Sequence, residues 1–76
     1  MSDINQSFAK ILKLLRTSKG LTQEELAELS GIDYKYLQKL ESQNPSSPTL
    51  STLEKLSIGL KISITDLVSQ IDINSD

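Results

Sequence analysis

The segment from residue 34 to residue 42 combines hydrogen-bonding side chains with positive charge. Placed on a helix at about 100° per residue, it puts Leu37 and Leu40 on one side, with Tyr36 and Glu41 at the edges. The opposite arc carries Tyr34, Lys35, Gln38, Lys39 and Ser42. All five can hydrogen-bond and none is acidic, which suits contact with base edges and phosphates. The alternative is an ordinary solvated helix face.

Composition excludes several other kinds of chemistry. The 76 residues include no Cys and no His, so disulfides, thiolate metal sites and imidazole catalysis are absent. Glu24, Glu25 and Glu28 lie close in sequence, but Glu25 fits a helix cap and the others fit a solvated helix face. We therefore expect no enzyme activity, no metal and no cofactor, and no small-molecule ligand is implied.

The net charge of −2 argues mildly against a nucleic-acid partner, because neutralising phosphates requires cations. The distribution of charge weakens that objection. Six of the 8 basic residues lie before Glu41: Lys10, Lys13, Arg16, Lys19, Lys35 and Lys39. A local patch governs docking even when net charge is unfavourable.

Glycines, prolines and capping residues divide the chain into five short helices, and no strand-like alternation persists. We expect helices over about 4–19, from Thr22 to about 30, over 34–42, and after caps at Thr49 and Ser63. The predicted fold is all-α, a compact five-helix helix-turn-helix domain. Residues 1–76 form one domain with its core at about 4–71 and a frayed tail at 72–76.

Helical spacing predicts which apolar residues face inward. The expected inward positions are Ile4, Phe8, Ile11, Leu12 and Leu15 in the first helix, Leu26, Ala27 and Leu29 in the second, and Leu50, Leu53, Leu56 and Leu60 in the fourth. Gly31 suits a left-handed turn between the second and third helices, and Asp33 suits the next cap. Gly59 interrupts the fourth helix, and close approach of another helix or subunit would explain it.

From about Leu12 to Leu67 the chain resembles the Cro and phage-repressor type of helix-turn-helix protein, the XRE family of bacteria and phages. The residues that carry this likeness are Leu15-Arg16, Lys19 through Ala27, Ser30-Gly31-Ile32, Leu37, Leu40-Glu41, Pro48 and Leu60 through Leu67. The resemblance implies a sequence-specific transcriptional regulator that reads double-stranded DNA with its third helix.

By this resemblance, Gln23 would bond a phosphate or an edge base. Tyr34, Lys35 and Lys39 correspond to positions that meet bases in the major groove, and Gln38 is an adjacent candidate. Arg16 and Glu41 match an internal ion pair, and their places at the margins of their apolar stripes agree with that structural role.

The stretch Asp33 to Leu37 also resembles restriction–modification controller proteins, which have a Tyr at the position of Tyr36 and consist of this domain alone. Tyr36 has a competing explanation as a packing residue whose hydroxyl reaches solvent or a phosphate.

The loop from Ser42 to Ser47 departs from the family pattern because it lacks Gly and any cation. Asn44 can adopt a left-handed turn, and Asn44 and Ser46 can donate to phosphates. Only ~2–4 phosphates should be neutralised per subunit, so the salt dependence should be shallow.

The C-terminal segment has more apolar residues than one short helix can bury. Ile58, Ile64, Val68 and Ile71 are candidates for a two-fold homodimer interface, and Ile73 adds to the surplus. The alternative is that they close the core.

A rival function is a protein-interaction module, antitoxin-like or coactivator-like, that uses the same fold to hold a protein partner. The acidic surface and uncharged loop favour it, and the third helix opposes it. The polar N-terminus resembles no signal peptide and no apolar run could span a membrane, so we expect a cytoplasmic protein.

Overall fold

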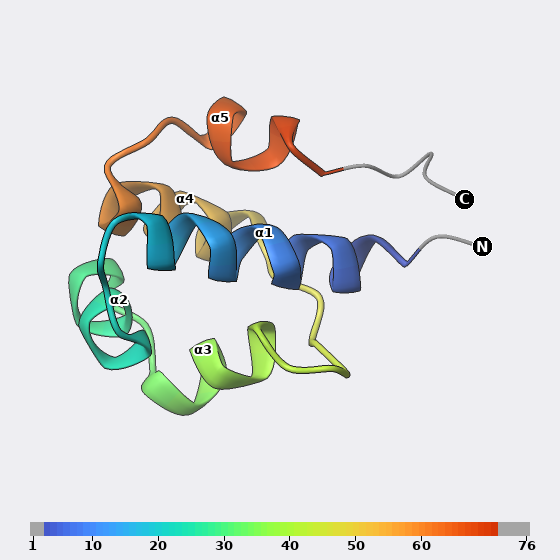
Figure 1. Ribbon diagram of the computed structural model, residues 1–76, viewed down its shortest axis with the longest axis horizontal. Helices are drawn as coiled ribbons and strands as arrows, with labels where there is room; N and C mark the ends of the chain where they lie inside the picture. Colours follow the sequence, from blue (N-terminus) through green and yellow to red (C-terminus); the bar gives the residue numbers. More distant parts are fainter. Residues whose placement is uncertain (1–2, 72–76) are drawn as a thin grey trace.

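The computed structural model describes residues 3–71, and this part of the chain is all-helical. Its five helices are α1 Ile4–Ser18, α2 Gln23–Ser30, α3 Tyr34–Leu40, α4 Leu50–Leu60 and α5 Ile64–Ser69. In Figure 1, α1 runs along the long axis, with α5 on one side and α2 and α3 on the other. The all-helical, five-helix prediction is confirmed. The predicted frayed tail, 72–76, and Ile73 lie outside the described residues.

Each helix begins at a side chain that accepts a hydrogen bond from the first turn. The N-caps are Asp3, Thr22, Asp33, Thr49 and Ser63. Thr22 forms a complete capping box, since its hydroxyl accepts from the Glu25 amide and the Glu25 carboxylate accepts from the Thr22 amide. A cap contributes about 0.5–2 kcal/mol, so local sequence sets where these short helices start.

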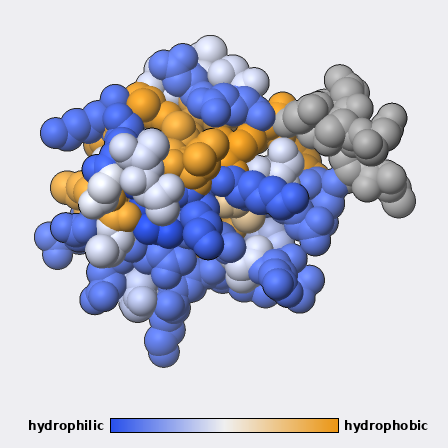
Figure 2. Space-filling model, viewed as in Figure 1, coloured by the Kyte–Doolittle hydropathy of each residue, from blue (hydrophilic) through white to orange (hydrophobic). Residues whose placement is uncertain are grey.

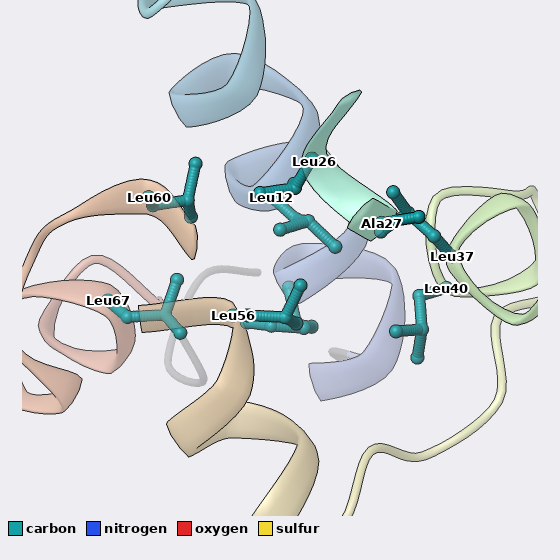
Figure 3. Close-up of a cluster of buried hydrophobic side chains, with 9 residues drawn as sticks. Leu12, Leu26, Ala27, Leu37, Leu40, Leu56, Leu60 and Leu67 are labelled. Carbon is teal, nitrogen blue, oxygen red and sulfur yellow. The ribbon is translucent and has the colours of Figure 1, made fainter. Parts of the chain in front are cut away.

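Leucines from all five helices form the core. The most deeply buried side chains are Leu12, Leu26, Leu37, Leu40, Leu56, Leu60 and Leu67. In Figure 3, Leu37 and Leu40 enter this cluster from one side, and Leu60 and Leu67 from the other. Burying each leucine contributes roughly 1.5–3 kcal/mol. The third helix is therefore anchored by the same cluster that holds α4 and α5.

Three residues predicted to face inward are instead on the surface. Ile4 is 50% exposed, Leu29 52% and Leu50 83%. Leu50 is the first residue of α4, directly after the Thr49 cap, and the buried residues of this helix begin only at Thr52. Ile4 is likewise the first residue of α1, and Leu29 lies at the margin of its stripe, where helical spacing alone does not decide burial. The third helix also ends earlier than predicted, at Leu40, with Glu41 as its C-cap.

Gly59 is explained by close packing of α4 on α2. A Cβ at Gly59 would overlap the Ser30 Oγ and would lie 3.1 Å from Leu26 Cδ1. The Ser30 hydroxyl is itself buried and has no hydrogen-bond partner among the described residues. Of the two explanations expected from sequence, close approach of another helix within the same chain is observed.

Replacing Gly59 with Ala is expected to lower the free energy of unfolding, measured by urea denaturation. Overpacking costs about 1–3 kcal/mol, and the better helix propensity of Ala recovers at most ~1 kcal/mol. Repeating Gly59→Ala in a Ser30→Ala background should give a smaller loss, because the nearest overlapping atom is gone. Equal losses in both backgrounds would show that the Ser30 hydroxyl is not the obstacle.

Candidate nucleic-acid interface

A tight turn between α2 and α3 sets the direction of the third helix. Gly31 has a φ of 70°, a left-handed conformation that glycine adopts without steric cost. This turn brings the Ile32 amide within 3.0 Å of the Ala27 carbonyl oxygen. The Asp33 carboxylate then accepts from the Tyr36 amide at 3.2 Å and starts α3. The chain thus changes direction over the three residues 31–33, and α3 begins at Tyr34.

The face of α3 opposite its two core leucines is open to solvent and carries polar side chains. Tyr34, Lys35, Gln38 and Lys39 are all exposed. The Gln38 Nε2 donates to the Tyr34 hydroxyl at 3.0 Å, which links the two residues across one turn. The structure brings four of the five predicted residues together on one short surface. The fifth, Ser42, lies beyond the end of α3, is half-buried, and its hydroxyl donates to the Lys39 carbonyl oxygen at 2.8 Å. None of the four is acidic, so the surface offers donors, acceptors and two positive charges.

Tyr36 lies at the edge of α3 and packs against the core. Its hydroxyl lies 3.2 Å from the Thr52 Oγ1 of α4, and Thr52 in turn lies 3.1 Å from the Thr49 Oγ1. The ring packing matches one expectation, but the hydroxyl contacts a buried threonine rather than reaching into solvent. Tyr36 therefore ties α3 to the start of α4.

Arg16 of α1 and Glu41 at the end of α3 form a buried bidentate ion pair. Arg16 Nε lies 2.8 Å from Glu41 Oε2, and Arg16 Nη2 lies 2.9 Å from Oε1, with side-chain exposures of 10% and 2%. Arg16 Nη1 also donates to the Leu21 carbonyl oxygen at 2.8 Å. The hydrogen bond to Glu41 raises the pKa of the Arg16 guanidinium, against the lowering effect of burial.

Gln23, the first residue of α2, is joined to this ion pair. Its Nε2 donates to Glu41 Oε1 at 3.1 Å. The family resemblance gives Gln23 only a contact with a phosphate or an edge base. The bond to Glu41 could not be predicted, because the two residues are 18 positions apart and no local pattern links them. One hydrogen of the amide nitrogen is used by Glu41, which leaves the second for another acceptor.

The loop after α3 differs from expectation in its backbone. Asn44, which can adopt the left-handed conformation, does not do so here, since Lys61 is the only non-glycine residue with positive φ among those described. Asn44 is exposed and Ser46 is half-buried. Instead, a tertiary contact holds the loop, since Gln6 Nε2 of α1 donates to the Gln43 carbonyl oxygen at 3.3 Å.

Two short helices joined by a glycine turn, with the second helix anchored inside and polar outside, define a helix-turn-helix unit. Comparison with known proteins agrees. The family model described as helix-turn-helix matches residues 12–67. The control protein C.MunI of a Mycoplasma species is 37% identical over 73 residues, which cover 95% of this chain and 97% of that protein.

Solved structures give the same result. The restriction–modification controller protein C.AhdI from Aeromonas hydrophila superposes with a TM-score of 0.77 at 38% identity, over 83% of this chain and 94% of that one. The protein C.Esp1396I bound to a 19 base pair DNA duplex superposes with a TM-score of 0.79 at 31% identity, over 93% of this chain and 99% of that one.

The lengths of the other relatives vary. The regulator y4dJ from Sinorhizobium fredii is 39% identical, and the chain spans 83% of it. The chain spans 38% of SutR from Escherichia coli and 55% of SinR from Bacillus licheniformis.

The chain belongs to the helix-turn-helix family of DNA-binding transcriptional regulators, of the XRE type, which includes the restriction–modification controller proteins. This is a family of regulators and not of enzymes. In the described part of the chain, residues 3–71, no helix is long and apolar enough to cross a membrane.

The buried ion pair leads to a stability prediction. Glu41→Ala should lower the free energy of unfolding by ~3–5 kcal/mol, because it leaves Arg16 buried without its counter-ion. The double variant Arg16→Met, Glu41→Leu should recover much of that loss, since no unpaired charge remains. Urea denaturation of both variants measures the difference.

Gln23→Ala is the matched control, because it removes one hydrogen bond to Glu41 and keeps the ion pair. Its loss should be about 0.5–1.5 kcal/mol. If Glu41→Ala were no worse than Gln23→Ala, the ion pair would not be a constraint on the fold.

Proposed function

We propose that this protein binds DNA sequence-specifically as a two-fold dimer and inserts α3 into the major groove of an inverted-repeat operator. The observation that carries the proposal is the acid-free outer face of α3, made by Tyr34, Lys35, Gln38 and Lys39. In a chain with net charge −2, a face with two cations and no carboxylate is the surface that a phosphate-lined groove can accept.

Each residue of this face has a role that follows from its chemistry. Lys35 and Lys39 would donate to guanine O6 and N7 or to phosphates. Tyr34 and Gln38 would act as a pair, because the Gln38 amide already donates to the Tyr34 hydroxyl and keeps its carbonyl oxygen free to accept. The DNA-bound structure of the related C.Esp1396I supports the choice of DNA as partner.

Contacts with the DNA backbone would come from the two ends of the helix-turn-helix unit, the start of α2 and the loop after α3. Gln23 would donate its second amide hydrogen to a phosphate, with its first held by Glu41. Asn44 and Ser46 would donate from the loop after α3, at the other end of that helix. These groups carry no charge, so they would set the register on DNA without adding to the salt dependence.

The dimer is supported by apolar residues that this chain leaves on its surface. Ile58 is 66% exposed and Ile64 is 41% exposed, while Val68 is half-buried. Ile71 packs against the core, which favours the core-closing role for that residue. Two copies joined through Ile58 and Ile64 would each present one α3, and half-sites one DNA turn apart, about 34 Å, would follow.

The protein-interaction function remains the second candidate, favoured by the acidic outer side of α2 with Glu24, Glu25 and Glu28. The two candidates differ in salt dependence, because a module that only holds a protein would show no salt-sensitive binding to duplex DNA.

The DNA-binding prediction is tested on an operator selected from random duplexes at low salt. Lys35→Gln and Lys39→Gln should each weaken binding to that operator by about tenfold or more, since a good base contact contributes ~1–3 kcal/mol. Lys55→Gln, an exposed lysine on α4, is the charge-matched control and should bind nearly as the parent does. Fluorescence anisotropy gives each affinity for the operator and for a scrambled duplex.

A drop in affinity for both duplexes alike would assign the lysines to phosphates only. The role of α3 as the reading helix is rejected if neither lysine variant nor Tyr34→Ala changes the ratio of the two affinities.

The dimer prediction is tested by sedimentation equilibrium. Ile58→Gln should weaken self-association by tenfold or more and should weaken operator binding in proportion, because burial of a large aliphatic side chain contributes roughly 1.5–3 kcal/mol. Leu29→Gln removes a similarly exposed side chain from α2 and should leave the dimer intact. A parent protein that stays monomeric at high concentration would remove this part of the proposal.

A further inference from the structure

A groove of about 530 Å³ lies between α1 and the segment that follows α3. From α1 it is lined by Gln6, Lys10 and Lys13, and from the other side by Ser42, Gln43 and Asn44. The hydrogen bond from the Gln6 amide to the Gln43 carbonyl oxygen links the two walls. The two walls of the groove are therefore joined by a tertiary contact between α1 and the loop.

The charge in this groove is positive. Lys10 and Lys13 are exposed and lie three residues apart, on one side of α1. Within residues 3–71, the single ion pair joins Arg16 to Glu41, so neither lysine has a carboxylate partner there. Glu41 also borders the groove, but its carboxylate is buried and bonded to Arg16 and Gln23. Two ammonium groups thus stand beside polar side chains without a counter-ion.

These lysines lie next to a loop that carries no positive charge of its own. Residues 42–48 carry no cation, although the loop adjoins the C-terminal end of the proposed reading helix. Figure 2 shows that the face seen there is hydrophobic between α1 and α5 and mostly hydrophilic on the side of α2 and α3. The groove lysines lie beside the loop in space and well before it in sequence, so α1 supplies the charge that the loop lacks.

We propose that this groove is a second DNA contact, in which Lys10 and Lys13 bind phosphates of the strand that passes the C-terminal end of α3. Asn44 donates a hydrogen bond to the same stretch of DNA backbone, whereas the Ser42 hydroxyl already donates to the Lys39 carbonyl oxygen at 2.8 Å. The inference rests on the proposed function, since it requires α3 to lie in the major groove. It adds a site outside the helix-turn-helix unit that contributes affinity and carries no sequence information.

The test compares two charge-matched double variants on the selected operator. Lys10→Gln, Lys13→Gln removes the groove lysines, and Lys55→Gln, Lys61→Gln removes two others. All four positions are exposed. Lys10, Lys13 and Lys55 lie in helices, which glutamine suits, and at Lys61, the left-handed C-cap of α4, lysine and glutamine both carry a Cβ. Urea denaturation should therefore show similar folding. For the groove variant the slope of log affinity against log salt should become shallower by about 0.9 for each phosphate that is no longer neutralised, which is ~1.8 for each subunit and ~3.6 for the dimer on the operator. The control variant should keep the slope of the parent protein.

The preference for the operator over a scrambled duplex should be unchanged in the groove variant. In addition, operators with single methylphosphonate linkages locate the bound phosphates. One or two neutralised linkages should weaken binding of the parent protein and have no further effect on the groove variant.

Equal slopes for the groove variant and the parent would overturn the groove inference, while Lys35→Gln could still reduce specificity and leave the proposed function intact. If the parent protein showed no salt-sensitive DNA binding, the groove inference and the proposed function would both fail. A lower preference for the operator in the groove variant would contradict the backbone role and place the lysines against bases.

Discussion

The buried ion pair between Arg16 and Glu41 connects the parts of the chain that must be placed relative to one another. Arg16 comes from the last turn of α1, and Glu41 caps the end of α3. The same guanidinium bonds the Leu21 carbonyl oxygen just before α2, and the same carboxylate accepts from Gln23 at its start. Three helices therefore meet at one charged centre. Since either ion alone would be costly to bury, arrangements of the helices that separate the pair are disfavoured.

This centre also removes one negative charge from the surface next to α3 in an acidic protein. Glu41 lies between the outer face of α3 and the α1 groove, where an exposed carboxylate would repel phosphates. Burial and bidentate pairing with Arg16 neutralise it. The acids of α2, such as Glu24 and Glu28, lie on a different helix surface. Net charge therefore understates the positive charge at the C-terminal end of α3, because Lys39 is exposed there and Glu41 is paired.

Sequence reasoning identified those features that local rules control. Caps at Thr22, Asp33 and Thr49 and the turn at Gly31 are fixed by neighbouring residues, so the helix starts were predictable. The outward face of α3 followed from two leucines at helical spacing. Burial at the margins of a stripe was not predictable, as Leu29 shows, because it depends on which helix covers that margin.

Contacts between distant segments escaped sequence reasoning for a related physical reason. The Gln23–Glu41 bond, the Gln6–Gln43 bond and the fit of Ser30 against Gly59 each join residues that no periodicity relates. Each depends on the angle at which two helices cross, and core packing sets that angle. The same crossing brings Lys10 and Lys13 beside a loop that has no charge of its own. A surface assembled from α1 and the segment after α3 exists only in the folded chain, so α2 and α3 by themselves carry only part of the positive charge that the domain can present to DNA.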